Sequence, residues 1–577
     1  MRIRRAAVAV ALAAVLTLEA APGAAAAGKV DTTFGSGGIA TGPFGIGARA
    51  AAVALAPDGR IVVAGDQRGA GGEGALTARI GAAGAADPTF SGSGARVDTF
   101  GTGATPQRAG AVAAQPDGAV VIAGVAGDKW ALARFLPTGS NDGLFGAAGV
   151  TLRDPSPGSG PPEEFYPYEV PALPDGTGPA AIAIAPGGQI VVAGSVAVSN
   201  DDGIPSEQIA VARFSSTGVP DPAFGRDGFA VLQLGFGSAI RHATSSARAL
   251  VLLADGRIVI AGRASARDGG DRAFLARLAT NGSLDLGFAR QGRILVQLGR
   301  ASSARVASSS LAGLTVRPDG RFVAAGRATD VAGSHAVLLA GFTATGELDR
   351  AFARLGFAVT QLGRTYDPAP PASAARAVAL APDGAAVVAG AATAGAVAAR
   401  YDAAGALDCG YGTRGRALAF GGGRFSLATD GASAAALQPD GRLLLAGRLA
   451  GGGLLLGRLT AGASTATGSA APRLVTLAAR HTGRGRGYAY GLVDGACEVV
   501  NVRFSIKGAG PIVSTRVQRV FGRSGPQVVC APLTGLRMGT TYKVRMEASP
   551  KGSGRGAQRL LRIAKPTGRV LTQSGCR

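Results

Sequence analysis

The sequence predicts an all-β protein, in which a seven-bladed β-propeller is followed by a small β-sandwich. Three observations lead to this fold class. The 577 residues include 92 glycines and are 47% hydrophobic but only 17% charged, which is typical of short strands separated by tight turns. A turn recurs seven times along the chain, five times as Pro-Asp-Gly and once each as Pro-Gly-Gly and Ala-Asp-Gly. Roughly the last 105 residues replace this repeat with longer strands of alternating polarity.

Residues 1–27 have the pattern of a secretory signal peptide. Three arginines precede an apolar run from Ala6 to Leu18, and small residues follow as far as Ala27. The run is shorter than the ~20 apolar residues that a membrane-spanning helix needs, and no later stretch approaches that length. We therefore expect export, a secreted or cell-surface location, and no transmembrane segment.

The internal repeat defines a propeller over residues 28–460. Its turns are spaced by about 64 residues on average. Each unit holds four β-type runs bounded by turn residues, and the Asp-Gly pair supplies the positive φ angles of a tight hairpin. Four antiparallel strands repeated seven times fit a propeller, whereas a β-solenoid would need shorter rungs. The seven turns begin at Pro57, Pro116, Pro186, Ala254, Pro318, Pro382 and Pro439.

The two ends of the repeat array predict how the ring closes. The seventh unit stops after LLLGRLT, residues 454–460, and lacks a fourth strand. Residues 30–38, VDTTFGSGG, are an orphan copy of that strand at the amino terminus. We expect residues 30–41 to pair beside residues 454–460 as the outer strand of the last blade.

The repeats resemble the delta-60 repeat, a β-propeller repeat of exported bacterial proteins that is generally described without a known function. The resemblance rests on the pattern PDGRIVVAG … ALARxxxxGxLDxxFGxxG and covers residues 28–462. It implies the propeller and no particular activity. The fifth unit departs from the pattern with Gly341 in place of an arginine, and the sixth has Asp408, Cys409, Gly410 and Tyr411 in place of DxxF.

An aspartate precedes the last strand of every unit, and an arginine stands eight residues earlier in five of the seven. A planar guanidinium binds a carboxylate through two hydrogen bonds, so we interpret these residues as structural pairs across a hairpin. A sevenfold catalytic or calcium-binding role is the less favoured alternative. In the seventh unit Arg458 is expected to meet Asp31 across the closure. The aspartates are Asp31, Asp87, Asp142, Asp221, Asp285, Asp349 and Asp408.

A linker over residues 461–471 leads to a basic domain over residues 472–577. Its strands predict a β-sandwich, and residues 533–548, LTGLRMGTTYKVRMEA, resemble the corner of a fibronectin type III domain with Tyr542 as the corner tyrosine. From residue 463 onward 19 Lys and Arg face three acids, a net charge of +16 out of +22 for the chain. The electric field of this positive charge attracts polyanions. The alternative is that the arginines only keep the protein soluble. The expected contacts are Arg480, Arg484, Arg486, Arg516, Arg519 and Arg523.

Four cysteines occur in a chain that we expect to be exported, where disulfides persist. Cys497 precedes the third strand of the expected sandwich, and Cys530 lies in a strand that neighbours the second. A disulfide between Cys497 and Cys530 is therefore the first expectation. The pairing of Cys409 and Cys576 stays open.

Motifs for metal binding or catalysis are lacking. The three histidines are isolated in sequence, and no nucleophile elbow, zincin motif or phosphate loop occurs. We expect no metal, no cofactor and no enzymatic activity. The alternative is an extracellular polysaccharide hydrolase or lyase with two carboxylates of perturbed pKa near the ring axis. A purely structural role at the cell surface is the third hypothesis.

The loops predict which face of the ring binds a ligand. If each blade runs outward from the axis in chain order, the constant Asp-Gly turns lie on one face. Loops that vary in length, including the insertion at residues 154–179, lie on the other, where binding residues are often found unless that face merely tolerates insertions. We expect a monomer that binds an extracellular protein, a glycan or an anionic wall polymer, and no specific nucleic acid. The expected ligand contacts are Trp130, Glu163, Glu164, Phe165, Tyr166, Tyr168 and Arg241.

Overall fold

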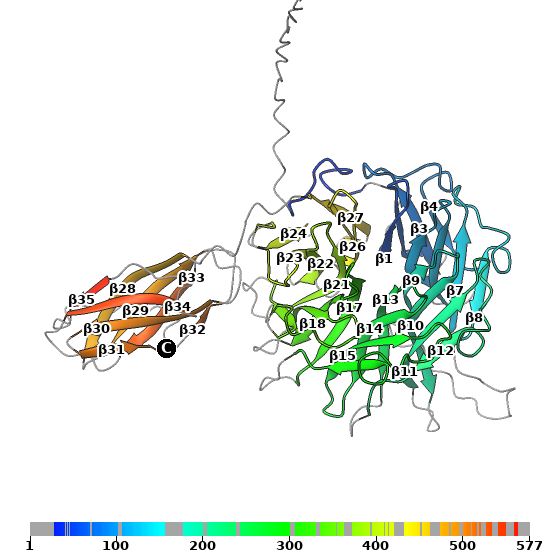
Figure 1. Cartoon of the computed structure of the whole chain (residues 1–577). Coiled ribbons are helices and arrows are strands. Elements are labelled where there is room, and N and C mark those ends of the chain that lie inside the picture. The colour runs from blue at the N-terminus through cyan, green and yellow to red at the C-terminus, as the bar shows by residue number, and fades with distance from the viewer. Residues whose placement is uncertain are drawn as a thin grey trace, which may run out of the picture.

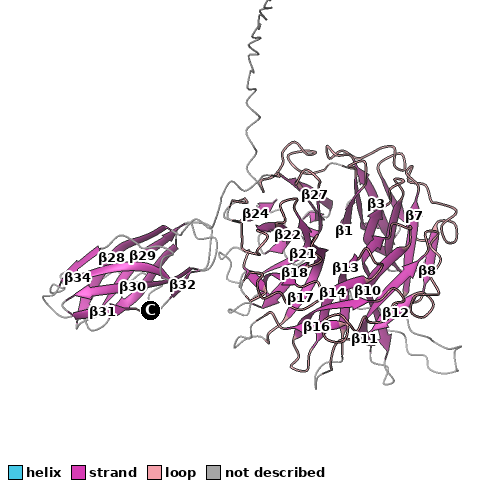
Figure 2. Cartoon of the chain, in the orientation of Figure 1, coloured by secondary structure: helices cyan, strands magenta, loops and turns pink. Residues whose placement is uncertain are grey.

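The computed structural model describes most of the chain from residue 28 onward. The described residues are 28–40, 42, 44, 47–69, 72–101, 107–155, 177–199, 205–237, 243–299, 306–329, 335–353, 355–362, 372–392, 395–408, 410–412, 415–419, 432–449, 453–461, 473–483, 486–494, 500–508, 510–515, 518–520, 527–533, 541–549 and 559–562. The regular elements within these ranges are all strands (Figure 2). Nowhere in them is there a helix of the length and apolarity that crossing a membrane requires.

Seven antiparallel sheets surround a common axis and form a seven-bladed β-propeller (Figure 1), as the repeat predicts. The inner strand of each blade contacts the inner strands of its two neighbours, and the other strands follow outward in chain order. The first four blades comprise β1 (Ala48–Leu55), β2 (Ile61–Gly69), β3 (Gly72–Ile80) and β4 (Ala95–Asp98); β5 (Gln107–Ala114), β6 (Val120–Ala126), β7 (Lys129–Phe135) and β8 (Val150–Arg153); β9 (Gly178–Ile184), β10 (Ile190–Ser199), β11 (Pro205–Phe214) and β12 (Phe229–Leu232); and β13 (Ser245–Leu252), β14 (Ile258–Ser265), β15 (Asp271–Leu278) and β16 (Arg293–Val296). The other three comprise β17 (Ser309–Val316), β18 (Phe322–Thr329), β19 (His335–Phe342) and β20 (Phe357–Thr360); β21 (Ser373–Leu380), β22 (Ala386–Ala392), β23 (Gly395–Tyr401) and β24 (Arg416–Ala419); and β25 (Ala432–Leu437), β26 (Leu443–Leu449) and β27 (Gly453–Leu459).

The repeated Asp-Gly turn closes the first hairpin of each blade. In the first blade Gly59 has φ +82°, a left-handed value that glycine adopts without strain. Asp58 Oδ1 accepts the backbone N–H of Arg60 at 3.0 Å. The equivalent glycines of the other six turns have φ between +78° and +83°. The turn is therefore one structure repeated seven times.

Among the described residues, the hydrophobic core of the propeller comprises seven clusters, one at each boundary between neighbouring blades. A strand such as β6 is buried along its whole length, because neighbouring blades cover both of its faces. Such strands read as continuous apolar runs rather than as alternating ones. This explains why the second strand of each unit is the most apolar part of the repeat.

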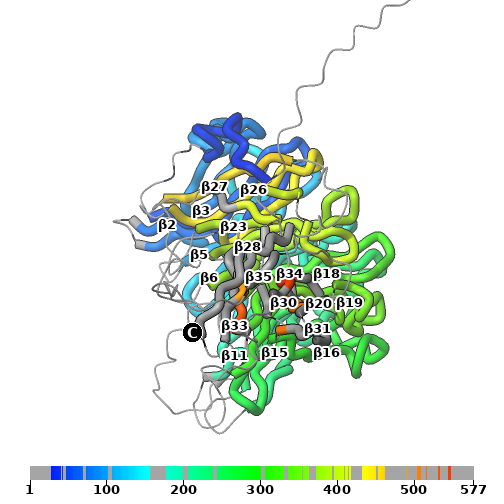
Figure 3. The backbone as a smooth tube through the Cα atoms, turned by 90° about the vertical axis from the view of Figure 1, so that its left-hand side faces the viewer, coloured from blue at the N-terminus to red at the C-terminus, as the bar shows by residue number. Residues whose placement is uncertain are grey.

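The ring closes through its two ends. Val30 pairs with Leu459, and Ile39 pairs with Gly457, so the first described residues form the outer edge of the blade of β25, β26 and β27. The backbone N–H of Ala40 donates to the carbonyl of Leu456 at 2.8 Å. Figure 3 shows the dark blue amino-terminal segment beside the yellow β26 and β27. Residues more than 400 positions apart thus complete one sheet.

The arginine and aspartate pairs expected across the hairpins are present. In the described part of the chain, four of the six guanidinium groups also donate to a carbonyl of the next blade: Arg79 to Pro137, Arg134 to Ser216, Arg213 to Thr280 and Arg458 to Ala82. One side chain therefore joins its own hairpin to its neighbour. The pairs are Arg79 with Asp87 (2.6 Å), Arg134 with Asp142 (3.3 Å), Arg213 with Asp221 (2.8 Å), Arg277 with Asp285 (2.8 Å), Arg400 with Asp408, and Arg458 with Asp31 (2.8 Å).

In the fifth blade a different arginine replaces the one that the repeat lacks. A Cβ atom at Gly341 would lie 2.4 Å from Cγ of Phe352, so the aromatic ring occupies the vacant space. The guanidinium of Arg317 lies over that ring, 5.5 Å from its centroid, and donates to the carbonyl of Ala403 at 2.7 Å. The fifth blade therefore keeps its connection to the sixth.

Because of these ion pairs, we expect the folded protein to lose stability in acid. Burial alone raises the pKa of Asp31, Asp87 and Asp285, but hydrogen bonds and the arginine charges outweigh it, and each pKa is lower than 3.8 in the folded protein. The stability they contribute is present above pH 3.8 and is lost as the pH falls through the folded pKa values. Asp66, whose pKa burial raises, acts in the opposite direction. We expect the melting temperature to fall between pH 5 and pH 3, and Asp87→Asn to weaken that dependence. A melting temperature that rises over this interval would contradict the assignment.

The carboxy-terminal region forms two further sheets. One has the order β28 (Arg473–Gly483), β29 (Arg486–Asp494) and β33 (Gln527–Leu533). The other has the order β31 (Gly510–Ser514), β30 (Val500–Gly508), β34 (Thr541–Ser549) and β35 (Arg559–Arg562), and β32 (Gln518–Val520) pairs with β30. β28 contacts β34 and β35 of the second sheet. The fibronectin type III resemblance and the domain boundaries stay predictions.

Candidate functional site

Every inner strand of the propeller carries a β-bulge at the same position. The bulge adds one unpaired residue to the strand that lines the axis, and a bulge redirects the side chain at that point. The seven bulge residues are Ala51, Gly110, Ala180, Arg248, Ala312, Arg376 and Ser433.

The bulge explains the glycine that ends the repeated VVAG and VIAG sequences. In the first blade a Cβ atom on Gly65 would lie 1.9 Å from the carbonyl oxygen of Arg49, and on Gly262 it would lie 1.9 Å from that of Ser246. The same approach, within 2.1 Å, recurs at Gly124, Gly194, Gly326 and Gly390. Only glycine admits the backbone of the bulged strand so closely. The motif therefore fixes the shape of the axial wall.

A cavity of about 460 Å³ lies on the axis, lined by the inner strands of all seven blades. Its wall includes the ends of β1, β5, β9, β13 and β21 where the chain enters each blade. This is the face at which the chain enters each blade, and β9 begins at Gly178, at the end of the inserted segment 154–179. Five arginines and a single carboxylate, that of Asp66, are among the described lining residues. The arginines are Arg49, Arg108, Arg248, Arg376 and Arg448.

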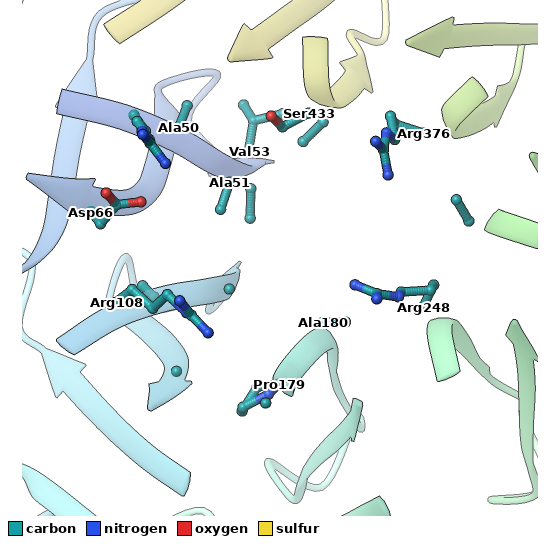
Figure 4. A pocket seen from close by; sticks show the side chains of 18 of the residues that line it. Ala50, Ala51, Val53, Asp66, Arg108, Pro179, Ala180, Arg248, Arg376 and Ser433 are labelled. Carbon is teal, nitrogen blue, oxygen red and sulfur yellow. The ribbon is translucent and has the colours of Figure 1, made fainter. Parts of the chain in front are cut away.

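The charges are arranged unevenly around the axis. Figure 4 shows Arg248 and Arg376 on one wall, with Arg108 and Asp66 on the opposite wall. The chain order agrees with this view, because Arg248 and Arg376 belong to the fourth and sixth blades and the other two to the second and first. One wall is therefore purely cationic, and the other combines both signs of charge.

The cationic wall has charges that the described protein does not neutralise. Burial lowers the pKa of Arg248, the charge of Glu207 opposes this, and the nearby guanidinium groups lower it further. Burial also lowers the pKa of Arg376. Among the described residues neither guanidinium has a hydrogen bond or an ion pair, although both stay charged at neutral pH. Arg248 is half-buried and Arg376 is exposed to the cavity, and two neighbouring cations without a counterion attract an anion.

Glu207, the acid whose charge acts on Arg248, is already engaged. Its carboxylate pairs with Arg263 and accepts a hydrogen bond from Ser195 Oγ at 2.9 Å. Arg263 also lies 3.8 Å from Asp271. In addition, burial and the charge of Arg376 lower the pKa of Arg327, which lies on the second strand of the fifth blade. The carboxylates of Glu207 and Asp271 therefore lie beside Arg263 on the second strand of the fourth blade, and neither pairs with Arg248 or Arg376.

Asp66 is the counterpart on the opposite wall. It is 8% exposed, and it pairs in register with Arg49 across β1 and β2. Burial raises the pKa of Asp66, and the charges of Arg49 and Arg108 partly offset that effect. Its Oδ2 atom has no hydrogen-bond partner in the described part of the chain. This atom is therefore buried without a partner beside the cavity and does not face its open space.

The prediction for Trp130 is wrong. It is 2% exposed and packs in the core between the second and third blades, where its ring centroid lies 6.0 Å from that of Phe229. It lies on β7, and neighbouring blades cover both faces of that strand, so it has no surface to offer a ligand.

The other predicted site residues divide into two groups. Arg480, Arg486 and Arg519 lie on β28, β29 and β32, and Cys530 lies on β33 in register with Tyr490. The Cys497–Cys530 disulfide and the polyanion contacts thus stay predictions. The residues outside the described ranges are Glu163, Glu164, Phe165, Tyr166, Tyr168, Arg241, Arg484, Arg516, Arg523, Cys497, Cys409 and Cys576.

Sequence reasoning missed the axial arginines. Their signal is an arginine inside an alanine-rich strand, six or eight residues before the turn, as at Arg49, Arg108, Arg248 and Arg376. An arginine in such a strand is conspicuous, but the local sequence does not show that these positions line the axis.

Comparison with known proteins supports the fold. Residues 56–90 and 253–288 match the family model described as "Domain of unknown function (DUF5122) beta-propeller". The chain is a β-propeller by sequence match and by structure. No curated protein matches it.

Solved structures resemble this β-propeller only distantly. A protein from Lactobacillus plantarum is 15% identical with a TM-score of 0.35, over 70% of this chain and 97% of that one. The apo form of prolyl oligopeptidase B from Galerina marginata is 11% identical with a TM-score of 0.34, over 78% of this chain and 55% of the peptidase. The chain therefore spans about half of that peptidase.

Proposed function

We propose that this β-propeller is a secreted, non-enzymatic binding protein that holds a small anion in its axial cavity. The observation that carries the proposal is the pair Arg248 and Arg376, a half-buried and an exposed arginine in the cavity wall that have no partner among the described residues. Cavities of several hundred Å³ suit small-molecule ligands, and arginine favours carboxylate, sulfate and phosphate groups. The single described carboxylate in the wall favours binding over hydrolysis by paired acids.

The rest of the molecule extends this proposal. The mature chain would be exported as a monomer of the delta-60 type, with a Cys497–Cys530 disulfide in a fibronectin-like sandwich. The net charge of +16 beyond residue 462 would attach it to a polyanionic surface, such as a wall polymer or an acidic glycan. Binding to such a surface would weaken as salt is added, because screening shortens the reach of exposed charges.

The test of the axial site is titration of the mature protein with sulfate by calorimetry. Arg376→Gln removes one charge-assisted hydrogen bond, which is worth about 1.5–3 kcal/mol, so we expect the Kd to rise by roughly tenfold to a hundredfold. The melting temperature of the ligand-free variant should change little, because Arg376 is exposed and makes no hydrogen bond or ion pair with the described residues.

Arg226→Gln is the matched control, since Arg226 is 77% exposed and lies outside the cavity wall. It removes the same charge and should leave the Kd for sulfate within twofold of the wild-type value. An equal rise of the Kd for sulfate in both variants would mean that net charge alone causes the effect. No saturable binding of sulfate, phosphate or a carboxylate would disprove the proposal.

A further inference from the structure

Three consecutive blades each contribute a cation to one side of the axis. Arg248 belongs to the fourth blade and Arg376 to the sixth, and Figure 4 shows both on the cationic wall. Arg327 lies on β18 of the fifth blade, between them in the order of the ring. It is exposed, and among the described residues it has no hydrogen bond and no ion pair. The cationic wall therefore continues into a third arginine without a partner.

The repeat places Arg327 at a position that lines the cavity in other blades. This is the position on the second strand directly after the glycine that faces the bulged strand. Asp66, Val125 and Arg448 have this position in their blades, and all three line the cavity. Arg327 has it in the fifth blade, where the bulge residue, Ala312, carries only a methyl group. Arg327 is not itself a lining residue, so we assign it an effect of charge rather than a hydrogen bond to the ligand.

The three arginines are close enough for their charges to act on one another. Burial lowers the pKa of Arg248, and the charges of Arg376 and Arg327 lower it further. Burial and the charge of Arg376 also lower the pKa of Arg327. Charges separated by more than a Debye length, about 10 Å at 0.1 M salt, are largely screened from one another. One small ligand beside this wall would therefore interact with all three charges.

The described charges that act on this wall do not cancel. Besides the three arginines, Arg263 acts on it, and Glu207 and Asp271 act on it with the opposite sign. Both carboxylates lie beside Arg263. Four cations and two carboxylates leave a net charge of +2. A ligand with one negative charge would leave half of this charge unmatched, whereas a dianion would match it in full.

We propose that the axial cavity takes a phosphate group with two negative charges, either free or as a monoester, and that Arg327 selects for the second charge. This inference rests on the proposed function and names its ligand class. A phosphate monoester has a second pKa of about 6, so at pH 8 it carries close to two charges. Arg248 and Arg376 would donate to its oxygens, whose geometry the guanidinium fork matches. The cavity of about 460 Å³ also has room for the rest of a small ester.

The first test is calorimetry of the mature protein at pH 8 with methyl phosphate and dimethyl phosphate. The two probes share the phosphorus centre and differ by one methyl group and one negative charge. We expect methyl phosphate to bind at least tenfold more tightly. Succinate, which carries its two charges on separate groups, should also bind at least tenfold more weakly than methyl phosphate. Inorganic phosphate distinguishes the two sources, because tighter binding than that of methyl phosphate would identify free phosphate and weaker binding an ester.

Arg327→Gln tests the part of the third arginine. Coulomb energy is proportional to the charge of the ligand, so the Kd should rise about tenfold for methyl phosphate and about threefold for dimethyl phosphate. Arg327→Lys keeps the charge and should keep the preference for methyl phosphate. Arg350→Gln is the matched control, because Arg350 belongs to the same blade, is exposed and lies outside the cavity wall. It should change neither Kd beyond twofold.

The outcomes separate this inference from the proposed function. If methyl phosphate and dimethyl phosphate bind equally, or if succinate binds as tightly as methyl phosphate, the phosphate dianion is wrong and the anion site stands. If Arg327→Gln has no more effect than Arg350→Gln, the assignment of Arg327 is wrong. If no probe binds, the anion site itself is wrong. The comparison of probes needs only the wild-type protein, so it decides the ligand class even if Arg327→Gln does not fold.

Discussion

Arg458→Met is expected to lower the free energy of unfolding by about 3–5 kcal/mol, the usual cost of removing one partner from a buried ion pair. Arg458 is 4% exposed and Asp31 is 6% exposed, so the carboxylate would stay buried without its counterion. The variant also loses the hydrogen bond from Arg458 to the carbonyl of Ala82 in the first blade. Both contacts lie where the two ends of the chain join. Urea unfolding of the mature protein measures the effect.

The control for this prediction is Arg213→Met in the third blade. Arg213 pairs with Asp221 at 2.8 Å, but these side chains are more exposed and both belong to one continuous unit. We expect a smaller loss there, because water reaches the remaining carboxylate and no chain ends are released. Equal losses for the two variants would show that the closure has no special weight.

Gly341→Arg, which restores the residue that the repeat pattern expects, should nevertheless destabilise the protein by about 3 kcal/mol, as overpacking of a filled core does. The new Cβ atom would lie 2.4 Å from Cγ of Phe352, and this ring would have to leave its place beneath Arg317. Thermal and urea unfolding of the variant measure the loss.

Gly143→Arg is the matched control, because Gly143 is exposed and a Cβ atom there meets nothing within 4 Å. It should change the unfolding free energy by less than about 0.5 kcal/mol, as surface substitutions usually do. A gain in stability from Gly341→Arg would instead mean that the Phe352 ring moves aside. It would also mean that Arg317 stabilises the fifth blade less than an arginine at position 341 does.

The sequence predicted the ring because its signals are local. An Asp-Gly turn has one geometry wherever it occurs, and a fixed separation between Arg79 and Asp87 places them across one hairpin. Trp130 was misplaced because aromatic residues occur both at binding surfaces and in cores, and local sequence did not reveal that the next blade covers it. The axial site could not be predicted, since it joins residues from seven units. Its geometry depends on a bulge that no single repeat reveals.

The bulge residue and the glycine that faces it have different roles. The glycine fixes the path of the backbone, and the bulge residue sets the chemistry of the axial wall. Six of the facing glycines approach the bulged strand too closely to be replaced, yet the bulge residue itself varies from glycine to alanine, serine and arginine. A Cβ atom at Gly110 would lie 2.1 Å from the carbonyl oxygen of Pro179, so that position must stay glycine, whereas the other six already carry side chains. Rewriting those six residues alone should yield a series of proteins with the same architecture and different axial chemistry, which makes the ring a practical starting point for designed receptors.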